Sequence, residues 1–224
     1  MSLFKNIVLA ILLLSADYVS AQIYSTGLKA GPSFSNISGY YPYISTYKTG
    51  INIGGFLDYR FSDHAFISLD ALYEQKGYKY EDRDISAKIN LEGIRYYDYL
   101  NFPFMFKYKF GKTVKINLTA GTYLGFLLNA TETETEIDYS ISPPTETTQN
   151  SSIMHKTESV DMGFSFGLGF ERKVSTKLYL FFDSRINYGS MLIEPDKIFV
   201  EETRNKSFTL SFGLAYYLQQ IISK

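Results

Sequence analysis

A two-residue alternation over 114–128 is the feature that most constrains the fold of this chain. Every second residue from Val114 to Leu128 is apolar, except Thr122, and the residues between them are mainly polar or glycine. Because successive side chains of a β-strand point to opposite faces, this pattern predicts one strand with an apolar and a polar face. At about 3.4 Å per residue it spans roughly 50 Å, much longer than a typical strand of about five or six residues. A tilted crossing of a lipid bilayer explains such a strand.

Seven further segments repeat the alternation, which gives eight predicted strands in all. They cover about 24–37, 49–61, 65–79, 94–110, 159–173, 177–189 and 204–218. Tight turns at 62–64, 111–113 and 174–176 alternate with long connections at about 38–48, 80–93, 130–158 and 190–203. Each tight turn is expected to pair its flanking residues: Phe61 with Ala65, Phe110 with Val114, and Lys173 with Lys177. This register keeps the apolar faces of neighbouring strands aligned, as an antiparallel meander requires.

The positions of the charged residues indicate which way the apolar face points. In the central parts of the strands the charges fall on the polar side of the alternation, and the exceptions Asp98, Arg204 and Lys206 lie toward the long connections. A charge at the bilayer midplane on a lipid-facing surface would cost about 2–4 kcal/mol. We therefore expect the apolar side chains to face lipid and the charged ones to face inward. A soluble lipocalin-like barrel would show the reverse arrangement.

Closure of the sheet follows from the surrounding hydrocarbon, which offers no hydrogen-bonding partner to an open edge. The expected fold class is therefore all-β: a closed eight-stranded antiparallel transmembrane β-barrel with up-and-down meander topology. Eight strands leave an interior that side chains alone can fill. We predict a polar network that plugs this interior, formed by Asp58, Arg60, Asp70, Glu74, Lys107, Glu171, Asp183 and Arg185. The alternative interpretation is a polar path for protons or small ions.

The first residues have the organisation of a secretory signal peptide. Lys5 precedes an unbroken apolar run from Ile7 to Leu14, and Val19-Ser20-Ala21 offers a small-residue cleavage site. The apolar run is too short to cross a bilayer as a helix. We expect residues 1–21 to be the signal peptide and residues 22–224 to form the barrel domain.

Composition excludes several classes of function. The 224 residues include 22 basic and 23 acidic ones, so the net field suggests no nucleic-acid partner. The absence of cysteine excludes a disulfide framework, thiol catalysis and a lipid-modified cysteine. Aromatic residues make up 17% of the chain, and many lie near strand ends, which is typical of interfacial girdles. At the long-connection end this predicted girdle comprises Tyr73, Tyr78, Tyr80, Tyr96 and Tyr97.

Five segments of the chain resemble the outer-membrane β-barrel family of Bacteroidetes, often labelled porin-like or PorT-like. They are TGLKAGPSFSNISG (26–39), GGFLDYRFSDHAFISLDALYEQKGYK (54–79), YLNFPFMFKYKFG (99–111), TAGTYLGFLLNA (119–130) and GFSFGLGFE (163–171). The resemblance implies an integral outer-membrane location, contact with outer-membrane lipid, short turns in the periplasm and long loops outside the cell. It also implies recognition by the barrel-assembly machinery. Members of the family commonly end in an aromatic residue, but here residues 219–224 follow the last strand, so recognition would use the internal segment Phe208 to Leu218.

The residues that could carry chemistry are few. His64 lies in a tight turn and His155 in the longest connection, so they are expected on opposite sides of the membrane and cannot share a metal or a catalytic site. His155 with Ser151 and Ser152 is the one local candidate for catalysis, in a polar and mobile connection. We therefore expect no enzyme activity, no metal and no cofactor.

Two segments of the long connections could bind a partner. Acidic residues alternate with Thr from Thr131 to Asp138, which suggests either an oxygen-rich calcium site or, more simply, a solvated extension of the two flanking strands beyond the membrane. Tyrosines in the first long connection could bind a protein or glycan, or could form an aromatic belt: Tyr40, Tyr41, Tyr43 and Tyr47. The expected role is structural or adhesive, through these external loops. A small channel or a secretion-associated subunit is the alternative, with a rim-active lipid enzyme a more distant one.

Overall fold

The computed structural model describes residues 23–39, 44–82, 89–140, 142–193 and 203–218. The predicted signal peptide, Tyr40, Tyr41, Tyr43 and residues 219–224 therefore lie outside the described part of the chain. Among the described residues, no helix has the length and apolarity needed to cross a membrane.

The described chain consists almost entirely of β-strands. Their bounds are β1 (Ile23–Ser38), β2 (Ile44–Arg60), β3 (Ala65–Asp82), β4 (Ile89–Phe110), β5 (Val114–Asp138), β6 (Thr145–Ser152), β7 (Val160–Lys173), β8 (Leu178–Gly189) and β9 (Arg204–Tyr217). One 3₁₀ helix, η1 (Met154–Lys156), follows β6. Each of the eight predicted strands is present. β6 is an additional strand that lies within the connection predicted over 130–158.

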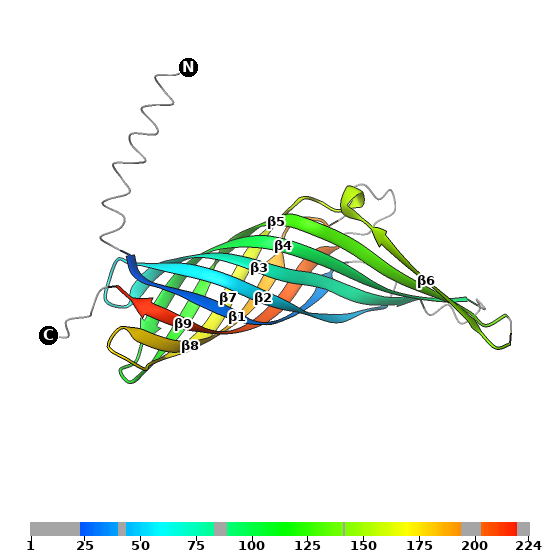
Figure 1. The fold of residues 1–224 in the computed structure, drawn as a ribbon. Coiled ribbons are helices and arrows are strands. Elements are labelled where there is room, and N and C mark those ends of the chain that lie inside the picture. The colour runs from blue at the N-terminus through cyan, green and yellow to red at the C-terminus, as the bar shows by residue number, and fades with distance from the viewer. Residues whose placement is uncertain (1–22, 40–43, 83–88, 141, 194–202, 219–224) are drawn as a thin grey trace, which may run out of the picture.

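The strands form a closed antiparallel barrel (Figure 1). β1 pairs with β9 on one side and with β2 on the other, and β4 pairs with β5. Of the nine strands in the sheet, β6 pairs only with β5, which leaves eight strands in the ring. The predicted fold class is therefore confirmed, including the closure between the first and the last strand.

The register at the tight turns agrees with the prediction in one case and differs in two. The backbone N–H of Phe61 donates to the carbonyl of Ala65 at 3.2 Å, as expected. Phe110 instead pairs with Ile116 and Lys173 with Tyr179, each two residues beyond the predicted partner. In the first of these turns Gly111 has φ of 102°, a conformation open to glycine, and the chain reverses over more residues than the alternation indicated. Because each register shift is two residues, every side chain stays on its predicted face of the sheet.

The outer surface of the barrel wall is apolar. Leu28 is 72% exposed and Phe212 is 63% exposed, and similar side chains cover the wall on every strand of the ring. Charged side chains in the middle of the same strands are buried inside, with Asp58 at 0% exposure. A water-soluble protein would not expose such a large contiguous apolar surface. The wall therefore has the predicted orientation, with apolar residues outward and charged residues inward.

Two aromatic clusters lie inside the barrel, one toward each end. Tyr24, Phe56, Phe66, Ala215 and Tyr217 form the cluster at the short-turn end. Tyr78, Tyr80, Tyr97 and Tyr99 pack with Ile153 at the other end. The predicted outward girdle at that end is thus wrong for Tyr78, Tyr80 and Tyr97, because these residues continue the inward-facing phase of β3 and β4.

Beyond the barrel, strands β3, β4 and β5 continue as a projecting sheet, joined by β6 (Figure 1). β5 leaves β7 after Phe126 pairs with Val160, and from Thr131 onward it pairs with β6. The prediction that 131–138 extends the barrel strands is confirmed for β5. It is wrong for β7, because residues 145–152, predicted as part of a mobile connection, supply the second strand.

Candidate functional site

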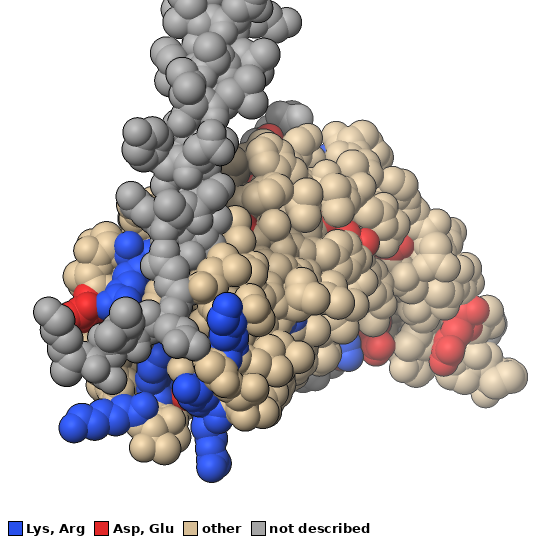
Figure 2. Space-filling view, turned by 60° about the vertical axis from the view of Figure 1, so that its left-hand side comes forward, with Lys and Arg blue, Asp and Glu red and all other residues tan. Residues whose placement is uncertain are grey.

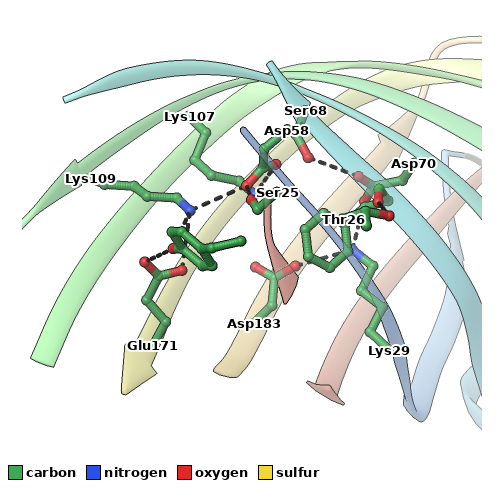
Figure 3. Close-up of polar contacts among 12 residues, drawn as sticks. Ser25, Thr26, Lys29, Asp58, Ser68, Asp70, Lys107, Lys109, Glu171 and Asp183 are labelled. Carbon is green, nitrogen blue, oxygen red and sulfur yellow. Dashed lines mark hydrogen bonds and ion pairs between the residues drawn. The ribbon is translucent and has the colours of Figure 1, made fainter. Parts of the chain in front are cut away.

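Two regions carry polar chemistry: the barrel interior and the projecting sheet. In the interior, three strands place ionised side chains in a cluster near the short-turn end (Figure 3). Lys107 Nζ lies 2.6 Å and Lys109 Nζ 3.2 Å from the Asp58 carboxylate. Lys109 also reaches Glu171 at 3.1 Å, and the Tyr217 hydroxyl donates a short hydrogen bond to the same carboxylate. Each carboxylate in this cluster is therefore held by at least two donors.

A second cluster lies at the middle of the barrel, on β1, β3 and β8. Lys29 Nζ and Arg185 Nη1 each lie 2.6 Å from the Asp70 carboxylate. Arg185 Nε lies 2.7 Å from Asp183, and Lys29 lies 3.4 Å from the same group. Two cations and two anions thus form a closed four-membered network, in which the attraction between partners offsets the loss of hydration.

Toward the projecting sheet the interior becomes less densely charged. Glu74 makes no ion pair among the residues that the structure describes. Its carboxylate accepts hydrogen bonds from Ser33 at 3.0 Å, Ser207 at 2.8 Å and Asn101 at 2.6 Å. Above it, Lys76 lies 3.0 Å from Asp161 and over the ring of Tyr123 at 4.4 Å.

The structure brings most of the predicted network residues into the interior. Seven of the eight are buried there: Asp58, Asp70, Glu74, Lys107, Glu171, Asp183 and Arg185. Arg60 is not among them, since it lies at the short-turn rim and pairs with Asp63 of the adjoining turn. The buried residues Lys29, Lys76, Lys109 and Asp161 belong to the same clusters but were absent from the predicted set. Their place in the inward phase of the alternation was a signal that could have identified them.

The space left between these side chains is small. The cavity lined by Lys29, Asp58, Glu171 and Arg185 has a volume of about 20 Å³. A single water needs about 10–15 Å³ of such volume, so this cavity holds about one water. Among the residues that the structure describes, this part of the interior is therefore a core plugged by side chains.

The projecting sheet carries a hydrogen-bonded cluster on the face that continues the barrel interior. The Tyr80 hydroxyl lies 2.9 Å from Glu132 and 3.0 Å from Glu134, and Arg95 Nε lies 2.6 Å from Glu132. Burial and the two carboxylates raise the pKa of the Tyr80 hydroxyl. Burial alone would raise the pKa of Glu132, but the Arg95 guanidinium, with Tyr80, outweighs it and lowers that pKa.

The outer edge of this sheet is β6. All eight residues of β6 are exposed, and among the described strands β6 pairs only with β5. On one face Thr133 donates to Asn150 at 2.6 Å, and the Thr135 and Thr148 hydroxyls lie 3.1 Å apart. Within the described residues, the backbone groups on the far side of β6 therefore pair with no other strand. The described carboxylates of the projecting sheet are Glu81, Asp82, Glu92, Glu132, Glu134, Glu136, Asp138 and Glu146.

Charge is distributed unevenly between the two ends of the molecule. Figure 2 shows Lys and Arg side chains gathered at the short-turn end, whereas Asp and Glu predominate toward the projecting sheet. The two histidines are also separated: His64 lies in the turn before β3, with Nδ1 3.0 Å from the Lys109 carbonyl, and His155 lies in η1. In the described part of the chain, no three acidic or histidine side chains are grouped closely enough to hold a metal ion.

Comparisons with known proteins agree with this architecture. The model of the family described as "Outer membrane protein beta-barrel domain" matches residues 21–190. No curated protein matches the chain.

Solved structures resemble the chain at low sequence identity. Ail, the attachment invasion locus protein of Yersinia pestis, is 10% identical, with 87% of this chain and 99% of Ail covered and a TM-score of 0.40. Neisserial surface protein A is 14% identical, with 85% and 96% covered and a TM-score of 0.41. The N-terminal β-barrel domain of OprF from Pseudomonas aeruginosa is 12% identical, with 88% and 99% covered and a TM-score of 0.37.

The family match spans most of the chain and includes every strand of the ring except β9. The apolar outer wall and the charged interior of this ring agree with the family's description. Such a wall requires contact with membrane lipid. The chain belongs to the outer membrane protein β-barrel domain family and is an integral protein of the outer membrane.

Proposed function

We propose that this protein is a non-catalytic surface protein that binds a protein or glycan partner through its projecting sheet. In this proposal the barrel anchors the sheet in the membrane, and the interior network keeps the barrel closed and rigid. The observation that carries the proposal is β6, an exposed strand of eight residues at the edge of a sheet that extends beyond the membrane.

An open strand edge presents a row of unpaired backbone donors and acceptors, to which an extended segment of another chain can add as a further strand. Natural edges are usually protected by lysine, proline or a bulge. The sequence of β6 is TETTQNSS, which contains neither lysine nor proline and only one charged residue, Glu146. We propose backbone pairing along β6 as the binding mode for a protein partner.

The charge of the projecting sheet narrows the chemistry of that partner. Its described residues carry eight carboxylates, and Lys79 and Arg95 are the cations on the same part of β3 and β4. An acidic surface attracts cationic segments and repels sulfated or phosphorylated glycans. A basic extended peptide or a neutral glycan is therefore favoured over an anionic polysaccharide.

A channel function has less support. Within the described residues, the interior cavity of about 20 Å³ and the aromatic clusters at both ends argue against a continuous water path. The expected result in planar bilayers is an absence of discrete conductance steps. Reproducible unit conductance from the purified protein would contradict this part of the proposal.

The finer family assignment is also a proposal. The five segments quoted above support the porin-like or PorT-like branch of Bacteroidetes, and the signal peptide over 1–21 supports export before assembly. The aromatic pattern of β9 from Phe208 to Tyr217 supports recognition by the barrel-assembly machinery. Membership of a secretion apparatus would show as loss of exported cargo on deletion of the gene.

Truncation of the projecting sheet tests the proposal. Thr133 and Asn150 already pair across β5 and β6, so replacing residues 134–149 with Asn-Gly closes the hairpin with a favourable two-residue turn. We expect the shortened protein to assemble in the membrane and to lose its partner or its adhesion.

A photo-crosslinking residue at Thr147 of β6 provides a direct readout, with Leu168 on the lipid-facing wall as its matched control. Protein adducts at 147 and lipid adducts alone at 168 are expected. Unchanged complexes in the shortened protein would contradict the proposal.

A further inference from the structure

Four cations lie together at the short-turn end of β5, β7 and β8, and we propose that they bind the phosphate groups of anionic phospholipids in the adjoining leaflet. The four residues, here called the basic rim, are Lys112, Arg172, Lys173 and Lys177. In barrels of this kind the short turns face the periplasm, which places the basic rim at the periplasmic leaflet.

Strand pairing brings these residues together. Arg172 of β7 pairs with Val114 of β5, and Val114 lies two residues after Lys112. On its other side Arg172 pairs with Leu180 of β8, which lies three residues after Lys177. Lys173 is the next residue of β7 and pairs with Tyr179. The two adjacent turns and the end of β7 therefore bring all four cations into one sector of the barrel end. Figure 2 shows Lys and Arg side chains gathered at this end of the molecule.

The basic rim lies directly beside the apolar wall. Arg172 is two residues beyond Phe170, an exposed aromatic on the same outward-facing side of β7. Val174, in the turn itself, is 57% exposed. The Lys177 ammonium lies 5.8 Å from the ring centre of Tyr216, another exposed aromatic of the wall. An aliphatic stem along the wall with a charged head beyond it is the arrangement by which lysine and arginine reach the headgroup region.

The basic rim has no carboxylate of its own. All four residues are exposed, and none of them makes an ion pair within the described chain. Arg60 on the opposite side of the same barrel end differs, because Asp63 neutralises it. The nearest carboxylate along the strand, Glu171, is buried and already engaged by Lys109 and Lys115. Four unneutralised cations next to a lipid surface match anionic phosphate groups in charge and in position.

Selectivity for lipid headgroups is measurable in the full-length mature protein refolded into phosphatidylcholine vesicles. The probes are nitroxide-labelled phosphatidylglycerol and phosphatidylcholine, whose immobilised fractions give a relative association constant. We expect phosphatidylglycerol to be favoured by about fivefold at low salt. Salt near 1 M, where the Debye length is about 3 Å, should reduce the ratio toward one.

Substitution locates the effect. Combined K112Q, R172Q, K173Q and K177Q should reduce the ratio to about one, and the charge-retaining K112R, K173R and K177R variant should keep it. The matched control, K79Q with K156Q, removes two exposed lysines from the other end of the molecule and should leave the ratio unchanged. Far-ultraviolet circular dichroism verifies that each variant has folded.

Three outcomes of the labelled-lipid measurements would overturn the proposal. They are a ratio near one in the unmodified protein, a ratio unaffected by the combined glutamine variant, and a ratio lost in the charge-retaining variant. Binding of inorganic phosphate to the protein in neutral detergent, without any preference among labelled lipids, would identify a free-anion site instead and would also overturn it.

Discussion

Strands β3, β4 and β5 run from the barrel wall, which lies in hydrocarbon, into the projecting sheet, which lies in water. Inside the barrel, Asp70 is bound by both Lys29 and Arg185, and the ring of strands has no free edge. Outside it, β6 exposes every side chain and, among the described strands, is paired along one edge only. Hydrocarbon tolerates neither an unpaired charge nor an unpaired backbone group, whereas water satisfies both. The comparison shows that closure is a requirement of the membrane, and that strands in water are free to serve binding.

The largest expected effect comes from breaking the interior network. Asp70→Ala would leave Lys29 and Arg185 buried with one carboxylate fewer, and removing one partner of a buried pair costs about 3–5 kcal/mol. Urea unfolding in phospholipid vesicles measures the loss. The matched control is Asp63→Ala, whose partner Arg60 stays hydrated at the rim, so little change is expected. Equal losses in the two variants would contradict the distinction between buried and hydrated pairs.

A charge placed on the wall tests the other face of the same strands. Phe166→Arg, in the middle of β7, should destabilise the barrel by about 2–4 kcal/mol, whereas Phe170→Arg near the strand end should cost about 0–1 kcal/mol. Both side chains are exposed on the outer wall, so burial within the protein does not explain a difference between them. Unfolding in vesicles gives both values. If Phe166→Arg were tolerated as well as Phe170→Arg, the wall would not cross the hydrocarbon core.

A smaller, local effect is expected in the projecting sheet as pH falls. Arg95 and Tyr80 keep the pKa of Glu132 below its ordinary value of 4.5, so the stability that this carboxylate contributes is present above pH 4.5. It is lost as pH decreases through the lowered pKa. Hydrogen-exchange protection factors of β5 residues 131–138 should therefore decline in that range.

The Glu132→Gln variant provides the control for this pH effect, because its sheet should show low protection without the same decline. Strand β7, which pairs with β5 only as far as Phe126, serves as the internal reference in each sample. A decline of equal size in Glu132→Gln would assign the pH dependence to other groups.

Much of the barrel could be predicted because two-residue periodicity reports directly on the two faces of a strand. Val114 to Leu128 identified one strand, and the same pattern located seven others in the ring. Turn register was less predictable, since Phe110 pairs with Ile116 and the alternation does not distinguish this partner from Val114. The alternation determines which face each side chain takes, and it therefore allows partners that differ by two residues. The backbone conformation of the turn determines which of these partners is paired.

The projecting sheet was harder to predict for a physical reason. β6 is exposed on both faces, so its sequence TETTQNSS has no apolar alternation and reads as a polar connection. Its strand conformation depends on pairing with Thr131–Asp138 of β5, a tertiary feature. Similarly, the inward phase of the strands indicated that Lys29 and Asp161 would be enclosed, but it could not identify their partners on distant strands.

The orientation of the wall is the central claim, and spin labelling tests it most directly. The chain has no cysteine, so single cysteines introduced at each position from 164 to 169 in β7 can be labelled without interference. The predicted result in vesicles is high collision with oxygen at 164, 166 and 168 and low collision at 165, 167 and 169, because lipid concentrates oxygen and the interior is filled. The opposite phase, with the even positions shielded and the odd ones open to lipid, would contradict the account.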